Sequence, residues 1–377
     1  MIDRRTVLRI GALGATGAVV TAGTGTALAA SDTPDAGRLG TRQEFDWIID
    51  CAGWGARPAS GQLEPSQTPT NKIIVHHMAF PNVEDYSREQ AIALARDCQD
   101  LHMDDNGWSD TGQHFTVSRG GFVLEGRHGS LEALSTGSNQ VIAAHCPGEN
   151  GRAIGIENEG TYVEVTPPEQ QVDALVRLLV GICQQYGLYA HDIFGHWDFR
   201  DTQCPGAAFY AQFPELRRRV ATDLGTPDTE IPERRWPDPW RFGDSPVVAA
   251  MQYLLSEHGY GLTPDGIYGQ LTLQALQDFQ QSNGLEPDPD GTCTPETWEN
   301  LVTEIRPGST GDAVSGLQFM LERKLIGQVT VTGEYDQATA AAVGELRALH
   351  GLDDGEGMNA NAWCAVVGGS VRQAFVD

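Results

Sequence analysis

The C-terminal third of the chain contains an internal repeat, which restricts the fold of that part more than any other feature does. Residues recur at a nearly constant separation of 65 to 67 positions. The matched pairs are Gln252 and Gln318, Gly266 and Gly333, Thr272 and Thr339, Gly284 and Gly351, and Trp298 and Trp363. Such a period indicates two copies of one structural unit. We therefore expect two small all-α repeats of three helices each, at residues 243–303 and 304–369.

The preceding part, residues 43–222, alternates between strand-like and helix-like segments. Strands are predicted in three apolar or alternating segments, 71–80, 114–127 (two strands around a Gly-Gly turn) and 153–160. Helices are predicted in segments 86–107 and 166–187, with Ser87 and Thr166 as N-caps and Gly187 as the end of the second helix. This order predicts an α/β domain with a mixed β-sheet flanked by helices.

The two remaining segments are predicted to be a leader and a linker. Residues 1–30 combine a paired Arg4-Arg5 start, a weakly apolar stretch and an A-x-A pattern ending at Ala29, which is typical of a secretory signal. The paired arginines resemble a bacterial twin-arginine leader, and an ordinary secretory signal is the alternative. Residues 223–242 carry four prolines and mixed charges, so they predict a semi-rigid linker.

The chain has a formal net charge of −26, which excludes several classes of partner. Nucleic-acid binding depends on a basic surface that displaces counterions, and anionic membranes attract basic segments. Beyond the leader there is no further run of about 18 apolar residues, so we expect no membrane span in the mature chain. We expect an exported monomer that acts on a neutral or mixed-charge substrate.

Seven cysteines stand in a chain that is predicted to reach an oxidising compartment. Six of them can form up to three disulfides and the seventh is then left over. An unpaired thiol would oxidise in that compartment unless something protects it, and a bound metal ion is one such protection.

A candidate metal site lies in the segment GHWDFRDTQCPG, residues 195–206. His196 ends a predicted strand, and the following loop can return Cys204 to a position beside it. Catalytic zinc takes three protein ligands from His, Cys and carboxylates and keeps one position open. A third ligand is expected from a neighbouring strand, where His76 is the natural choice. Adjacent strand residues point to opposite faces, so His76 and His77 cannot both line one site.

A second segment, AHCPG at residues 144–148, has a similar composition. His145 and Cys146 are adjacent and therefore poorly placed to bind one ion together. We interpret Cys146 as a disulfide partner and His145 as a candidate cleft residue.

Four segments of the α/β region resemble the zinc-dependent N-acetylmuramoyl-L-alanine amidases of type 2, a family that includes peptidoglycan recognition proteins. The matching segments, in chain order, are IIVHHMAF, GWSDTGQHFTVSRGGFVLEGR, AIGIENEG and GHWDFRDTQCPG. The resemblance implies Zn²⁺ as cofactor, with His76, His196 and Cys204 as its ligands. It also implies peptidoglycan as partner and cleavage of the amide bond between N-acetylmuramic acid and L-alanine.

The same resemblance assigns catalytic roles to two further residues. Thr202, two positions before the cysteine ligand, is expected to face the reacting carbonyl, and Glu157 is expected to be the acid/base. Glu159 lies on the same face of the predicted strand and is its rival. Gln113 stands where many family members have a catalytic tyrosine. A glutamine cannot transfer a proton, so the alternatives are catalysis by Glu157, a contribution from His114, or binding without cleavage.

Gln113, His114 and His77 are accordingly predicted to be substrate-binding residues. The first alternative function is a recognition protein that binds peptidoglycan without hydrolysing it. The second is a zinc peptidase that cuts the stem peptide itself. Because pure binders of this family typically lose the cysteine ligand, Cys204 favours the amidase.

The C-terminal repeats resemble the bacterial peptidoglycan-binding type 1 domain, through the series DGIYG, T, A, FQ and GL in the first copy. The second copy departs from that series, since Phe279 and Gln280 become Leu346 and Arg347. Cys293 and Cys364 fall near the equivalent tryptophans and are predicted to link the two repeats. The other disulfide candidates are all in the α/β domain: Cys51, Cys98, Cys146 and Cys183.

Overall fold

The computed structural model describes residues 45–200, 202–226, 232–239 and 245–372. The predicted leader, residues 1–30, lies outside these ranges. Among the described residues, no helix is long and apolar enough to cross a membrane.

The N-terminal domain is built on one five-stranded sheet with the order β3-β2-β4-β1-β5. All neighbours are parallel except the hairpin of β2 and β3. The strand bounds are β1 Lys72–His77, β2 Phe115–Val117, β3 Val123–Glu125, β4 Ala153–Asn158 and β5 Ile193–Gly195. The predicted mixed sheet is therefore confirmed, and its two central strands, β1 and β4, are the ones with the strongest apolar pattern.

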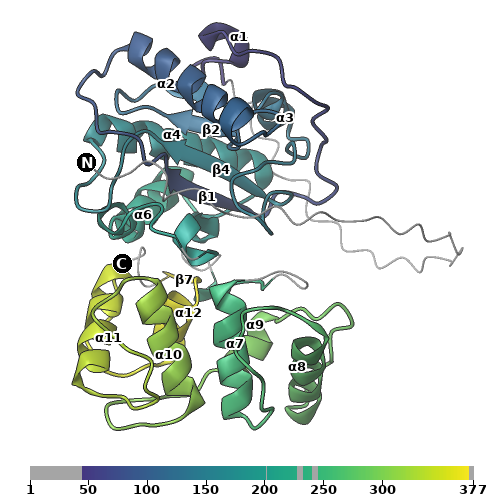
Figure 1. Ribbon diagram of the computed structural model, residues 1–377, viewed down its shortest axis with the longest axis vertical. Helices are drawn as coiled ribbons and strands as arrows, with labels where there is room; N and C mark the ends of the chain where they lie inside the picture. The colour runs from purple at the N-terminus through teal and green to yellow at the C-terminus, as the bar shows by residue number, and fades with distance from the viewer. Residues whose placement is uncertain (1–44, 201, 227–231, 240–244, 373–377) are drawn as a thin grey trace, which may run out of the picture. The chain divides into compact units, whose positions relative to one another are not determined.

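Helices cover both faces of this sheet (Figure 1). One face packs mainly against the long helices α4 and α6 in the largest apolar core of the domain. The opposite face packs against α1 and α2 in a smaller core that contains Trp54. The helix bounds are α1 Cys51–Trp54, α2 Arg88–Asp100, α3 Ser130–Thr136, α4 Glu169–Tyr186, α5 Ala207–Tyr210 and α6 Phe213–Leu224.

Strand parity decides which polar side chains lie on the α2 side of the sheet. Ile73 and Val75 of β1 enter the core with α4 and α6, so His76 lies on the other face. Ile154 and Ile156 of β4 do the same, which leaves Glu157 on the face of His76. The two are directly paired in the parallel register.

One predicted helix cap is correct and one is wrong. The Ser87 side chain accepts a hydrogen bond from the backbone N–H of Gln90, as an N-cap does. Helix α4 instead begins at Glu169, with Pro168 rather than Thr166 at the N-cap. The two consecutive prolines after Thr166 keep the backbone extended, since a residue before proline avoids helical geometry. Gly187 ends α4 in the left-handed conformation, as predicted.

Each C-terminal repeat consists of three helices around a shared apolar core, as the repeat pattern predicts. Their bounds are α7 Pro246–Glu257, α8 Gln270–Ser282, α9 Pro295–Leu301, α10 Asp312–Arg323, α11 Gln337–Leu349 and α12 Ala360–Val366. The recurring glutamine makes the same bonds in both copies. Gln252 accepts from the N–H of Gly266 and donates to Thr272, and Gln318 does so with Gly333 and Thr339. These recurring residues therefore hold the glycine turn against the first helix.

The predicted linker is more structured than its proline content indicates. Residues Arg234–Arg235 form β6, which pairs antiparallel with β7, Ser370–Val371. Trp236 is 2% exposed and stacks on Trp298, with ring centroids 5.5 Å apart. Trp236 thus belongs to the core of the repeats, because two large indole rings gain more from burial than from exposure.

All seven cysteines are buried and unpaired in the structure. The predicted disulfides, including the link between Cys293 and Cys364, are therefore not found.

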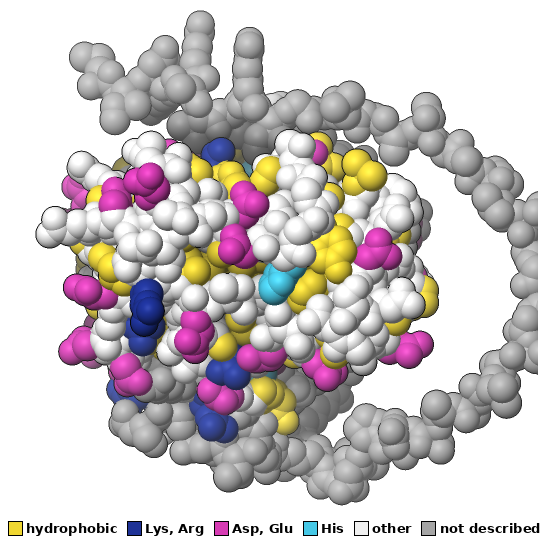
Figure 2. Space-filling model, turned by 90° about the horizontal axis from the view of Figure 1, so that it is seen from below, with side chains coloured by type: hydrophobic (Ala, Val, Ile, Leu, Met, Phe, Trp, Pro, Cys, Tyr) yellow, Lys and Arg dark blue, Asp and Glu magenta, His cyan; other side chains and the backbone are white. Residues whose placement is uncertain are grey.

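The acidic composition is visible at the surface: Figure 2 shows a face on which acidic side chains are scattered, while Lys and Arg gather toward one side.

Candidate active site

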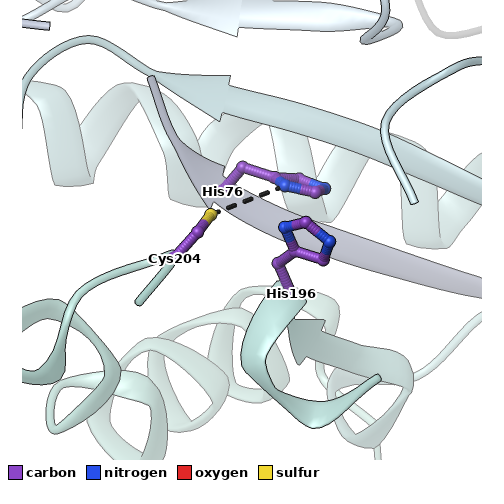
Figure 3. A group of neighbouring side chains, drawn as sticks. All are labelled: His76, His196 and Cys204. Carbon is purple, nitrogen blue, oxygen red and sulfur yellow. Dashed lines mark hydrogen bonds between the residues drawn. The ribbon is translucent and has the colours of Figure 1, made fainter. Parts of the chain in front are cut away.

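Three predicted metal ligands meet at the edge where β1 and β5 end. His76 lies in β1, His196 begins a short 3-10 helix after β5, and Cys204 follows in the next loop. Their nearest potential ligand atoms all lie within 4.8 Å of one another. His76 Nδ1 is 3.6 Å from Cys204 Sγ, and the sulfur also accepts a 3.3 Å hydrogen bond from the backbone N–H of His77 (Figure 3). The structure thus brings together the three residues that the sequence singled out.

The chemistry of this trio fits a divalent zinc ion. Burial keeps the pKa of His76 well below its usual value and lowers that of His196 to about 3, so both rings are neutral and have a free lone pair. The Nε2 atom of His196 is buried without a partner. Burial also raises the pKa of Cys204 well above that of an ordinary thiol, so the thiolate needs a cation beside it. Two neutral imidazoles and one thiolate form a typical zinc donor set.

His145 fixes the orientation and the tautomer of His76. Its Nε2 lies 3.4 Å from the carbonyl oxygen of Ala153, which can only accept, so Nε2 carries the proton. Its Nδ1 therefore accepts the 3.0 Å hydrogen bond from His76 Nε2, which leaves His76 Nδ1 unprotonated and directed at Cys204. Space for this ring exists because position 155 is glycine: a Cβ there would lie 2.4 Å from His145.

The sequence predicted His145 only as a candidate cleft residue and missed this positioning role. A signal for it was present, since a glycine inside a strand pattern often marks the close approach of another group. Gly155 is that glycine.

Glu157 lies beside the trio, and its rival does not. One carboxylate oxygen of Glu157 is 3.8 Å from His76 Nδ1, and the other is buried without a hydrogen-bond partner. Burial raises the pKa of Glu157 to about 8. Glu159 is only 1% exposed and accepts hydrogen bonds from Arg119 N at 2.7 Å and Gln90 Nε2 at 3.2 Å. Glu159 thus links helix α2 to the turn between β2 and β3, and only Glu157 is directed at the trio.

Gln113 is turned into the protein interior. It is 1% exposed, and its amide nitrogen donates to Thr116 Oγ1 at 2.9 Å and contacts Cys98 Sγ at 3.4 Å. Its predicted contact with substrate stays a prediction, and it would need this amide to leave its present partners.

His77 and His114, which are predicted to bind substrate, both form ring hydrogen bonds with the protein backbone. His77 Nδ1 accepts a hydrogen bond from Tyr162 N, on the sheet face opposite His76. His114 Nδ1 accepts from Gly155 N, and its Nε2 donates to Val141 O at 2.9 Å. These partners give both rings structural roles, and substrate contacts by them stay predictions.

Thr202 lies in the loop that carries the cysteine ligand. Its hydroxyl oxygen accepts a 3.1 Å hydrogen bond from the backbone N–H of Cys204. The hydroxyl hydrogen remains available for another acceptor. The role at the reacting carbonyl stays a prediction.

Comparison with known proteins identifies the family of this chain. The family described as N-acetylmuramoyl-L-alanine amidase matches residues 66–207. Peptidoglycan-recognition protein LB of Drosophila melanogaster is 35% identical over 167 residues, 44% of this chain and 66% of that protein. Peptidoglycan-recognition protein SC1a of the same organism is 30% identical over 161 residues, 42% of this chain and 80% of that protein. The chain belongs to the peptidoglycan-recognition protein and N-acetylmuramoyl-L-alanine amidase family.

Members of this family carry names of both kinds. The N-acetylmuramoyl-L-alanine amidase of Sus scrofa is 30% identical over 159 residues, which are 42% of this chain and 25% of that protein. The chain thus spans less than two thirds of the length of the LB protein and of the pig amidase. The solved structure of Drosophila PGRP-LB is 31% identical and covers 44% of this chain and 91% of that one, with a TM-score of 0.39.

The first C-terminal repeat has a family assignment of its own. The family described as putative peptidoglycan binding domain matches residues 244–301. Each part of the chain thus matches a family whose description refers to peptidoglycan or to an N-acetylmuramoyl-L-alanine amidase.

Proposed function

We propose that the chain is an exported zinc hydrolase that cleaves the amide bond between N-acetylmuramic acid and L-alanine in peptidoglycan. The observation that carries this proposal is the unpartnered carboxylate oxygen of Glu157 beside the His76, His196 and Cys204 trio. Two similarities support the same reaction: the relative from Sus scrofa is named N-acetylmuramoyl-L-alanine amidase, and the matching family has the same description. The twin-arginine-like start of the sequence supports export. The proposed substrate supports it too, because peptidoglycan is a polymer of the cell wall.

Zinc, when bound by the trio, supplies a water of lowered pKa and polarises a carbonyl oxygen. Glu157 takes a proton from the attacking water and returns it to the departing amide nitrogen, which is general base and general acid catalysis in turn. Its raised pKa in the metal-free protein suits both roles, because the carboxyl can hold and release a proton near neutral pH. Thr202 donates its hydroxyl hydrogen to the developing oxyanion.

The test is mass spectrometry of purified muropeptides after incubation with the zinc-loaded protein. We expect free stem peptide that begins at L-alanine. Glu157→Gln keeps the shape of the side chain and removes the proton acceptor, so it should retain zinc and lose turnover by at least about 100-fold. Glu164→Gln, an exposed residue of the same domain, is the matched control for the charge change. Wild-type turnover by the Glu157→Gln variant would remove Glu157 from the mechanism.

The second candidate function is recognition of peptidoglycan without cleavage. The buried amide of Gln113 favours this function, because an amide at this position cannot transfer a proton to the substrate as an acid/base group does. Intact muropeptide after incubation, with zinc demonstrated in the protein, would support this candidate and exclude the amidase. Release of a shorter peptide from within the stem would instead indicate a zinc peptidase.

We further propose that the repeats hold the chain on its polymer as a monomer. Linked weak sites raise the local concentration of the catalytic domain at the wall. The assignment of residues 244–301 to a peptidoglycan-binding family supports this role.

A further inference from the structure

The second repeat contains an open pocket that no family match covers. Its volume is about 680 Å³, and its walls come from the loop before α10, from α11 and from the loop before α12. The polar residues on these walls are Glu304, Arg306, Ser309, Arg347 and Asn359. Gly355 and Gly357 form part of the floor, so backbone rather than side chains borders the space there.

Arg347 occupies the position that Gln280 has in the first repeat, and the two side chains make equivalent bonds. Gln280 donates from its amide nitrogen to Thr292 O and Thr297 Oγ1, and it accepts from Asp288 N. The amide is thereby fully used in closing its own loop.

Arg347 closes the corresponding loop and retains unused donors. It donates from Nε to Asp353 O at 2.7 Å and from Nη1 to Gly357 O at 3.1 Å. A guanidinium has five N–H donors, so these two bonds leave a surplus. Position 362, where the first repeat has the hydroxyl of Thr297, is alanine, which takes up none of it. The second repeat has therefore exchanged a satisfied amide for a cation with free donors at a pocket wall.

The lining of this pocket carries more positive than negative charge, since it holds one carboxylate, Glu304, beside the two guanidinium groups of Arg306 and Arg347. Arg347 is 8% exposed, yet within the described part of the chain neither it nor the exposed Arg306 forms an ion pair. Other arginines of this acidic protein do pair, for example Arg234 with Glu299 at 2.6 Å and Arg152 with Glu149 at 2.9 Å. A buried cation without a counter-ion is costly, and an external anion removes that cost.

We propose that this pocket binds a carboxylate group of the peptidoglycan stem peptide, through the guanidinium groups of Arg347 and Arg306. The planar fork of an arginine matches the two oxygens of a carboxylate. The inference rests on the proposed function for the choice of polymer. A neutral glycan can accept hydrogen bonds from these arginines but supplies no counter-charge.

The test is retention of the full chain on insoluble peptidoglycan, measured by sedimentation in the Glu157→Gln background so that the polymer stays intact. Arg347→Gln installs the first repeat's residue, which closes the same loop there. We expect the apparent affinity to fall by about tenfold, the worth of one charge-assisted hydrogen bond. On peptidoglycan whose carboxylates have been converted to amides, the variant and its parent should be retained equally. Arg88→Gln, an exposed arginine of the amidase domain, is the control for net charge.

Arg306→Gln provides a second variant, whose exposed side chain can be replaced without disturbing the packed core of the repeat. It should weaken retention in the same direction. The inference would be overturned if Arg347→Gln and its parent were retained equally on native peptidoglycan. It would also be overturned if the variant lost as much affinity for amidated peptidoglycan as for native peptidoglycan. A loss confined to Arg347→Gln together with a lower melting temperature would overturn it as well. Hydrolysis of soluble muropeptides is a separate readout, so failure of the amidase proposal and failure of this one are distinguishable.

Discussion

The substitution Gly155→Ala tests whether His145 sets the geometry of His76, the proposed zinc ligand. An added Cβ would lie 2.4 Å from His145 Cγ and Cδ2 and 2.7 Å from its Nδ1, whereas ordinary contacts begin at 3.4 Å. The ring must therefore move by about 1 Å, which takes the 3.0 Å bond between His145 Nδ1 and His76 Nε2 beyond hydrogen-bonding range. Overpacking of this kind costs about 1–3 kcal/mol of stability.

The loss of this outer hydrogen bond should lower zinc affinity by about 10- to 100-fold. The measurement is competition for zinc against a chelator of known affinity, alongside thermal unfolding of the metal-free protein. His145→Ala should give the same loss of zinc affinity without the steric clash, which separates the two effects.

Gly344→Ala is the matched control. Gly344 lies exposed inside α11 with nothing within 4 Å of an added Cβ, so alanine should stabilise the protein by up to about 1 kcal/mol and leave zinc affinity unchanged. Wild-type zinc affinity in both Gly155→Ala and His145→Ala would refute the positioning role of His145.

Two further predictions concern stability. Because burial raises the pKa of Glu157 from 4.5 to about 8, the folded metal-free protein holds a proton that the unfolded chain releases, and stability falls as pH rises from about 4.5 to about 8. Glu157→Gln should remove that pH dependence. In urea unfolding at pH 8, the metal-free variant should be more stable than wild type by a few kcal/mol, and at pH 5 the difference should be smaller. The same difference in stability at both pH values would contradict the burial of this charge. In the second repeat, Gln318→Ala removes the acceptor for Gly333 N and the donor to Thr339, so it should destabilise the protein by about 2 kcal/mol. The equivalent substitution Gln252→Ala should lower the free energy of unfolding by a similar amount. A negligible change in stability at both positions would show that the shared glutamine does not hold the turn.

Sequence patterns predicted the elements of the α/β domain well where one local rule decided the structure. The alternation of apolar residues in 71–80 and 153–160 predicted β1 and β4, and the serine before α2 predicted its start. Thr166 failed because two local rules conflicted there: a threonine favours an N-cap, but the two prolines that follow hold the chain extended until Glu169.

The cysteines show a different limit. Their number and the predicted export indicated disulfides, but a disulfide requires that two particular Cβ atoms meet within about 4.5 Å. The fold instead leaves all seven thiols buried and unpaired, with Cys98 beside Gln113 and Cys51 donating to Gly126 O. Composition counts possible partners and does not say which of them are neighbours.

The sequence by itself determined the repeat period, the strand and helix order, and the residue types that can bind zinc. It also determined that His76 and His77 face opposite sides, because side chains in a strand alternate with period two. Only the tertiary structure decided that Glu157 rather than Glu159 lies beside the trio, since both have the same parity and differ only in what packs against them. The same holds for His145, which is separated from His76 by 69 positions and meets it only because Gly155 leaves room above the sheet. Local pattern fixes the direction of a side chain, and long-range packing fixes its partner.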